Sequence, residues 1–274
     1  MNFKQPIDRF SQCQAIVCDL DGTLYLDQTP VDGASLFLSR ILESRRKLFY
    51  FSNNTSKSRR TYLTKLEKMG FPVDDEYLIT SADCAENYLK SRNLYPRIYL
   101  VGNNDLVADF AKRGFTCLGD EEALKAPLPA AVVLGFDTEL TYQKIETCYH
   151  LILADVPYIA THGDVLCPVN KHQFKPDVGS FISLFETATG GGQPRIVGKP
   201  YKAAVEAICS RAGLPPDKIA FVGDRLYTDM RMAKQNNMAG VLVLSGETTL
   251  AMARESPDAP PIIVNSVTDL IEHL

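Results

Sequence analysis

Ala15-Ile16-Val17-Cys18-Asp19-Leu20-Asp21-Gly22-Thr23-Leu24-Tyr25 is the stretch that decides the fold. Residues 15–18 are continuously apolar, which is typical of a strand buried on both faces of a parallel sheet. The Asp-Gly pair at 21–22 indicates a tight turn soon after that strand. Ligands of open α/β sheets bind at the carboxyl ends of the strands, so this stretch predicts a polar site at Asp19 and Asp21.

Composition and charge narrow the class of protein. The 274 residues are 45% hydrophobic and 23% charged, which is ordinary for a globular protein with a sizeable core. The net charge of −4 gives no electrostatic reason to expect nucleic acid as a partner. No apolar run approaches the ~20 residues that span a bilayer, and residues 1–10 contain no apolar signal-peptide segment. We therefore expect no membrane partner and a cytoplasmic location.

The seven cysteines are scattered and contain no Cys-x-x-Cys pair. This spacing argues against a disulfide framework and against a zinc site, and it favours a reducing compartment. The sequence does not determine the number of chains in the assembly, and a homodimer is kept open.

Strands and helical segments alternate at both ends of the chain, which predicts βαβ units and a parallel sheet. The predicted strands of this outer pattern are 15–18, 47–51, 196–197, 218–222, 241–244 and 262–264.

The middle of the chain carries a second, less regular α/β pattern, with predicted strands at 97–101, 130–134 and 156–160. We therefore expect one core built from residues 1–82 and 188–274, interrupted by an inserted α/β domain at 83–187.

Polar side chains follow four strands of the outer pattern. They are Asp19 with Asp21, Ser52 with Asn53, Lys199, and Asp224 with Asp229. If all four strands belong to one parallel sheet, these groups meet at one edge. Each group alone is a weak signal, and the set is a strong one.

The charges of this set predict a phosphate site with a metal ion. Carboxylates that share one point repel each other by roughly 4 kcal/mol per pair at ~4 Å, and a cation relieves that repulsion. Oxygen ligands select a hard cation, so we expect Mg²⁺. Lys199 adds a positive charge, and Ser52 and Asn53 add hydrogen bonds to a phosphate. With Asp19 as the nucleophile, Asp21 would act as the general acid and base.

Simpler interpretations remain open for several of these residues. Ser52 and Asn53 are also typical of a helix N-cap, and Lys199 of a solvated lysine before a helix that starts at Pro200. For Asp229 we favour a structural role, in which it orients Lys199 or a metal-bound water.

Four segments together resemble the motifs of the haloacid dehalogenase superfamily. They are Asp-x-Asp-Gly-Thr (19–23), Ser-Asn-Asn (52–54), Gly-Lys-Pro (198–200) and Gly-Asp-x-x-x-x-Asp (223–229). The segment Asn-Asn-Thr-Ser-Lys-Ser-Arg (53–59) is similar to the IIA, or NagD-type, phosphatases. The resemblance implies a Rossmann-like, doubly wound parallel-sheet core with an inserted α/β cap domain.

The resemblance also implies roles for single residues. Asp19 would be nucleophile and Mg²⁺ ligand, and Asp21 would be the acid/base residue and reach the metal through its backbone carbonyl. Asp224 would be a metal ligand. Ser52, Asn53 and Lys199 would hold the phosphate, and we count Asn54 with them as a candidate substrate-binding residue.

Residues 160–168 resemble the cap loop that selects the substrate in this family. Relatives usually carry Asn in that loop, whereas this chain has His162-Gly163-Asp164. We count His162 and Asp164 as candidate substrate-binding residues, while a solvated turn histidine is an equally good interpretation of His162. Lys171, His172 and Lys175 would add cationic character or form a solvated face.

These observations predict a Mg²⁺-dependent phosphatase that acts on a small phosphorylated metabolite. The resemblance implies nucleoside monophosphates, sugar phosphates, phosphoglycolate or pyridoxal phosphate as candidate substrates. Two alternatives stay open: a phosphotransferase or mutase with the same aspartyl phosphate, and a non-catalytic, phosphorylatable receiver-like module.

Overall fold

The computed structural model describes residues 4–170 and 173–274, and the chain forms two compact units. Unit 1 contains Met1–Ser52, Arg60–Ile79 and Val205–Leu274, and unit 2 contains Asn53–Arg59 and Thr80–Ala204. Each unit has its own sheet and its own hydrophobic core. The predicted inserted domain, 83–187, falls within unit 2, and its boundaries stay a prediction.

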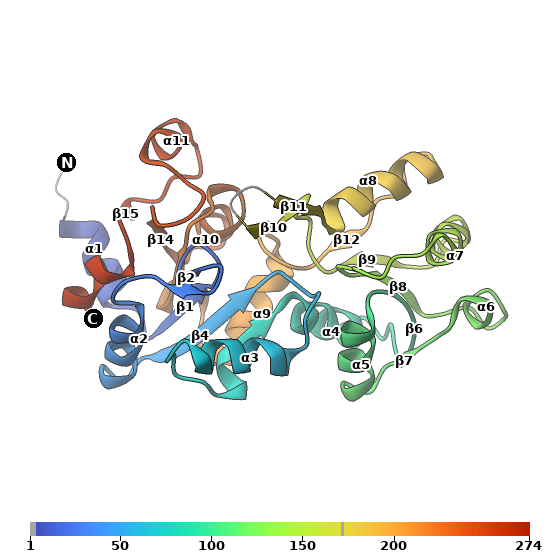
Figure 1. The fold of residues 1–274 in the computed structure, drawn as a ribbon, viewed down its shortest axis with the longest axis horizontal. Coiled ribbons are helices and arrows are strands. Elements are labelled where there is room, and N and C mark those ends of the chain that lie inside the picture. The colour runs from blue at the N-terminus through green and yellow to red at the C-terminus, as the bar shows by residue number, and fades with distance from the viewer. Residues whose placement is uncertain (1–3, 171–172) are drawn as a thin grey trace. The chain divides into compact units, whose positions relative to one another are not determined.

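The sheet of unit 1 has the strand order β15-β14-β13-β1-β4-β5. Figure 1 labels β15, β14, β1 and β4 of this sheet. Its strands are β1 (Ala15–Asp19), β4 (Lys47–Ser52), β5 (Leu78–Thr80), β13 (Ile219–Gly223), β14 (Ala239–Val243) and β15 (Ile262–Val264). The pairings from β15 through β4 are all parallel. Residues 15–18 of β1 are fully buried between β13 and β4, so the buried strand predicted from the apolar run is confirmed.

Several helices lie wholly or mostly in unit 1. They are α1 (Lys4–Ser11), α2 (Ala34–Glu43), α3 (Arg59–Lys68), α9 (Lys202–Ala212), α10 (Arg231–Gln235) and α11 (Leu250–Glu255). Short 3-10 turns lie at Asp75–Tyr77, Pro216–Lys218 and Val267–His273, a π-helical turn at Leu226–Met230, and a small ribbon of β2 (Tyr25–Leu26) with β3 (Thr29–Pro30). Helix α2 buries Phe37, Leu38 and Ile41, because these residues recur at helical spacing on one face.

Unit 2 is built on a second sheet with the order β12-β9-β8-β6-β7 (Figure 1). Its strands are β6 (Arg97–Val101), β7 (Thr116–Cys117), β8 (Ala131–Leu134), β9 (Tyr158–Ala160) and β12 (Arg195–Ile196), all paired in parallel. Its helices are α4 (Ser81–Ser91), α5 (Asn104–Lys112), α6 (Asp120–Ala123), α7 (Tyr142–Leu153) and α8 (Val178–Thr189). A two-stranded antiparallel sheet of β10 (Leu166–Asn170) and β11 (Gln173–Pro176) precedes α8.

The position of β12 corrects one sequence-based expectation. The strand predicted at 196–197 was expected in the outer sheet, but β12 pairs with β9 in the sheet of unit 2. The connection from β9 to β12 includes α8, so the two strands form a βαβ unit with the helix as the crossover. Lys199 therefore follows a strand of the second sheet, and the prediction that all four polar strand ends share one sheet edge is wrong for Lys199.

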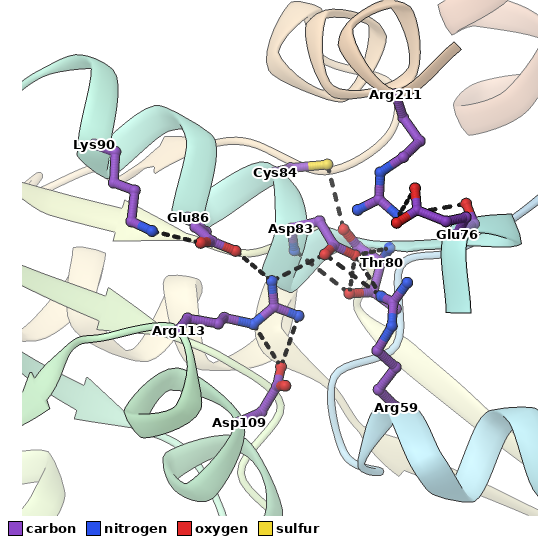
Figure 2. A network of polar contacts seen from close by, with 10 residues as sticks. All are labelled: Arg59, Glu76, Thr80, Asp83, Cys84, Glu86, Lys90, Asp109, Arg113 and Arg211. Atoms are coloured by element: carbon purple, nitrogen blue, oxygen red, sulfur yellow. Dashed lines mark hydrogen bonds and ion pairs between the residues drawn. The ribbon is translucent and has the colours of Figure 1, made fainter. Parts of the chain in front are cut away.

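A buried ion network stabilises unit 2. Figure 2 shows Arg113 among three carboxylates, and it donates to Asp83 at 2.9 Å, to Asp109 at 2.9 Å and to Glu86. Arg59 reaches Asp83 from the other side at 3.3 Å. Burial alone would raise the pKa of Asp83, but the two guanidinium groups outweigh it and hold that pKa below its usual value.

Two further findings hold for the described residues of both units. In residues 4–170 and 173–274, no helix combines the length and the apolar character required to cross a membrane. In the same described part of the chain, all seven cysteines are free thiols.

Candidate active site

The strand order of unit 1 changes direction between β1 and β13. Strands β4 and β5 continue the sheet on one side of β1, while β13, β14 and β15 extend it on the other. Cys18 of β1 is paired with Val222 of β13, so Asp19 and Asp224 come at the carboxyl ends of two neighbouring parallel strands. Such a reversal of strand order is the place where open α/β sheets bind their ligands.

Three carboxylates gather at this point. Asp19, Asp224 and Asp229 each offer an oxygen, and these oxygens lie within 4.8 Å of one another. Asp224 and Asp229 are 2% and 0% exposed. Two carboxylate charges no more than 4.8 Å apart repel by at least about 3 kcal/mol at an effective dielectric constant of 20. A hard cation removes this repulsion, and an oxygen-only donor set suits Mg²⁺.

Glycines and backbone N–H groups surround the acidic cluster. A Cβ atom added at Gly22 or Gly246 would overlap the carboxylate of Asp224, and one added at Gly223 would overlap Asp229. The backbone N–H of Glu247 donates to Asp224 at 2.7 Å, and that of Arg225 donates to Asp229 at 3.2 Å. These contacts hold the carboxylates of Asp224 and Asp229 in place close to glycine backbone, and the cluster fits a small metal ion.

Asp21 points to a different set of partners. Its carboxylate is half exposed, and it accepts a hydrogen bond from the Tyr25 hydroxyl at 3.1 Å. The Lys65 ammonium lies 3.9 Å from the other carboxylate oxygen. Burial raises the pKa of Tyr25, and the nearby charge of Asp21 adds to that effect, so the hydroxyl stays a proton donor in this hydrogen bond.

Asn53 and Lys199 form a buried pair in unit 2. The Asn53 Oδ1 accepts from the Lys199 backbone N–H at 2.9 Å, and Nδ2 donates to the Lys199 carbonyl at 3.2 Å. Lys199 itself is 3% exposed, which excludes the solvated lysine considered above. Ser52 is buried at the end of β4, and α3 begins only at Arg59, so neither Ser52 nor Asn53 directly precedes that helix as its cap.

The loop with His162 is anchored inside unit 2. His162 is 0% exposed, and its ring nitrogens lie 3.0 Å from Asp177 and 3.0 Å from the Thr161 hydroxyl. The interpretation of His162 as a solvated turn histidine is therefore wrong. Asp164 accepts from Asn53 Nδ2 at 3.3 Å, so the loop and the Lys199 segment share one partner.

Asn54 has partners both within its own turn and on β10, where its Nδ2 lies 3.5 Å from the Cys167 Sγ. Asn54 Oδ1 accepts from the backbone and side chain of Ser56 at 2.8 Å, which shapes the turn after β4. Lys175 is exposed, while Lys171 and His172 lie outside the described residues.

Sequence reasoning missed the two partners of Asp21. Tyr25 belongs to the same short stretch, and its distance of four residues from Asp21 was a signal that could have been used. Lys65 left no comparable signal, because it reaches Asp21 only through the packing of α3.

Comparison with known proteins agrees with this geometry. A haloacid dehalogenase-like hydrolase model matches residues 16–116, and a second model of the same class matches residues 196–270. Chronophin from Bos taurus is 30% identical, with 97% of this chain and 95% of chronophin covered.

Two solved structures support the same assignment. The 4-nitrophenylphosphatase of Thermotoga maritima has a TM-score of 0.89 at 32% identity, covering 96% of this chain and 98% of its own. NagD from Escherichia coli K-12 has a TM-score of 0.85 at 26% identity, covering 94% and 98%. This chain therefore belongs to the haloacid dehalogenase-like hydrolases and, within them, to the NagD-type phosphatases.

Proposed function

We propose that this protein is a Mg²⁺-dependent phosphatase that hydrolyses phosphate monoesters of small metabolites through a phosphorylated Asp19. The observation that carries the proposal is the cluster of Asp19, Asp224 and Asp229 at the reversal of strand order, with oxygens within 4.8 Å. The names of the relatives, among them 4-nitrophenylphosphatase, support phosphate monoesters as the substrate class.

In this proposal Asp19, Asp224 and the backbone carbonyl of Asp21 would hold the magnesium ion. The bound ion supplies positive charge that offsets the repulsion between an anionic nucleophile and an anionic phosphate. The oxygen-only donors and the glycine-lined space around Asp224 support this assignment.

The chain's own residues then carry out two phosphoryl-transfer steps, first to Asp19 and then to water. A carboxylate oxygen of Asp19 forms a bond to phosphorus, the bond from phosphorus to the ester oxygen breaks, and Asp21 donates a proton to that oxygen. A water molecule next attacks phosphorus while the Asp21 carboxylate takes its proton. The bond to Asp19 breaks, inorganic phosphate leaves, and both aspartates return to their starting states.

Phosphate binding is assigned to Ser52, Asn53 and Lys199. We propose that the Lys199 ammonium and the Ser52 hydroxyl contact phosphate oxygens. The Asn53 side chain bonds both backbone groups of Lys199, which supports a role for Asn53 in holding Lys199 in place.

Substrate choice is assigned to the inserted segment, 83–187, acting as a cap with its loop at His162 and Asp164. The candidate substrates are nucleoside monophosphates, sugar phosphates, phosphoglycolate and pyridoxal phosphate. A reducing, cytoplasmic location is part of the same proposal, and the seven free thiols support it.

The test is phosphate release from a panel of these metabolites and from 4-nitrophenyl phosphate, measured with Mg²⁺ and again after chelation by EDTA. We expect repeated turnover that stops with EDTA and returns when Mg²⁺ is restored. Asp19→Asn should abolish turnover while the circular dichroism spectrum stays that of the wild type. One phosphate per chain without turnover would favour the receiver-like alternative, and activity retained in Asp19→Asn would refute the nucleophile.

A further inference from the structure

Two side chains hold the two oxygens of Asp21 separately. The Tyr25 hydroxyl donates to Oδ2 at 3.1 Å, and the Lys65 Nζ lies 3.9 Å from Oδ1. The Asp21 side chain is 52% exposed, so without these contacts little would restrict its rotation.

Both partners are themselves fixed by packing. Tyr25 is fully buried, and its carbonyl accepts from the Gly22 N–H at 2.8 Å, which closes the turn that also carries Asp21. Lys65 Nζ lies 3.8 Å from the centroid of the Tyr25 ring, in a cation–π contact. The Lys65 side chain is only 17% exposed, a low value for a residue type that is mostly exposed.

We propose that Lys65 and Tyr25 are positioning residues that orient the Asp21 carboxylate for proton transfer to the leaving group. The proposal rests on the proposed function, in which Asp21 is the general acid. Proton transfer depends on geometry, because a catalytic group that is misplaced by about 1 Å can lose about 10²-fold in rate. A hydrogen bond to one oxygen and an ion pair to the other provide that orientation from two directions.

This role has a consequence that a purely structural role would not have. An alkoxide needs a proton as it leaves phosphorus, whereas 4-nitrophenolate is a stable anion and leaves without one. Loss of Asp21 orientation should therefore slow the cleavage of alkyl phosphates and spare the cleavage of 4-nitrophenyl phosphate. The ratio kcat/KM reports the steps up to this cleavage, so later hydrolysis of the phosphorylated Asp19 does not obscure the difference.

The experiment compares benzyl phosphate, which has an alkyl leaving group, with 4-nitrophenyl phosphate, which has a similar ring. Lys65→Met removes the positive charge and keeps an apolar chain over Tyr25. Lys65→Arg retains a positive charge at this position, and Tyr25→Phe removes only the hydroxyl group. Lys68→Met, on an exposed position of the same helix, is the matched control.

We expect Lys65→Met and Tyr25→Phe each to lower kcat/KM for benzyl phosphate about tenfold more than for 4-nitrophenyl phosphate, a part of the ~10²–10⁴ that general acid catalysis supplies. Lys65→Arg should recover most of the loss, and Lys68→Met should match the wild type. Equal losses on both substrates, or no loss, would overturn the positioning roles while leaving the phosphatase intact. A wild type that hydrolyses neither substrate would overturn the proposed function, and the positioning roles with it.

Discussion

Replacing Arg113 with methionine removes the cation at the centre of the ion network in unit 2. Its side chain and that of Asp83 are 10% and 8% exposed, so the pair is shielded from water. In this variant Asp83 would retain its ion pair with Arg59 at 3.3 Å, and Glu86 would retain its ion pair with Lys90 at 2.7 Å. Breaking a buried pair costs about 3–5 kcal/mol, and because these partners remain we expect about 3 kcal/mol.

Thermal and urea unfolding, followed by far-ultraviolet circular dichroism, measure this loss, since the chain has no tryptophan to report fluorescence. A loss of about 3 kcal/mol should lower Tm by about 6–12 °C. The matched control is Arg40→Met, which breaks an ion pair whose side chains are 55% and 61% exposed and should cost less than about 1 kcal/mol. If Arg113→Met is no less stable than Arg40→Met, the reasoning about the buried network is wrong.

The same network predicts how stability depends on pH. The folded state holds the pKa of Asp83 below its usual value, so in acid the unfolded chain takes up this proton at a higher pH than the folded chain does. The stabilisation is therefore present above the unfolded pKa of about 3.9 and is lost as pH falls through the lower, folded pKa. Arg113→Met removes part of the cause of the lowered pKa, so its difference in stability from the wild type should shrink below about pH 4. A difference that stays constant from pH 7 to pH 3 would contradict this.

Two further substitutions test the candidate active site. Gly246→Ala places a methyl group where the Asp224 carboxylate lies, so the Mg²⁺ concentration for half-maximal activity should rise about tenfold or more. The control is Gly119→Ala, which has open space around it and should leave this concentration unchanged. An unchanged Mg²⁺ dependence in Gly246→Ala would refute the role of the close glycine contact in placing Asp224. Asn53→Ala leaves two buried backbone groups of Lys199 without their hydrogen-bond partner, which costs about 1–3 kcal/mol for each group. Because this cost displaces Lys199, kcat/KM for 4-nitrophenyl phosphate should fall at least about tenfold. The exposed Asn104→Ala is its control, and equal kinetics for both would remove Asn53 from the site.

Local sequence patterns predicted most strands of the two large sheets. The strands predicted at 15–18 and 97–101 are confirmed, because burial on both faces of a strand leaves an apolar signal within a few residues. The acidic cluster was also predictable in part, since Asp19 directly follows such a run and Asp224 comes one residue after the end of another.

The choice of partners was not predictable from the same patterns. Strand β12 has two residues, too few to indicate which sheet it joins, and its neighbour β9 lies more than thirty residues earlier. The side-chain bonds of Asn53 to Lys199 span 146 positions, and the Lys65–Asp21 pair depends on how α3 packs. Such contacts follow from the tertiary fold, which a local pattern does not contain.

The placement of β13 next to β1 bears on how the protein is made. β1 ends at Asp19 and pairs on one side with β4, which ends at Ser52, but its other neighbour begins only at Ile219. At ~5–20 residues per second, a ribosome needs roughly 10–40 s to synthesise the intervening chain, and all of unit 2 is made in that time. A nascent β1 thus has no partner on one edge until β13 has been made, and this pairing of distant segments is of the kind that slows folding.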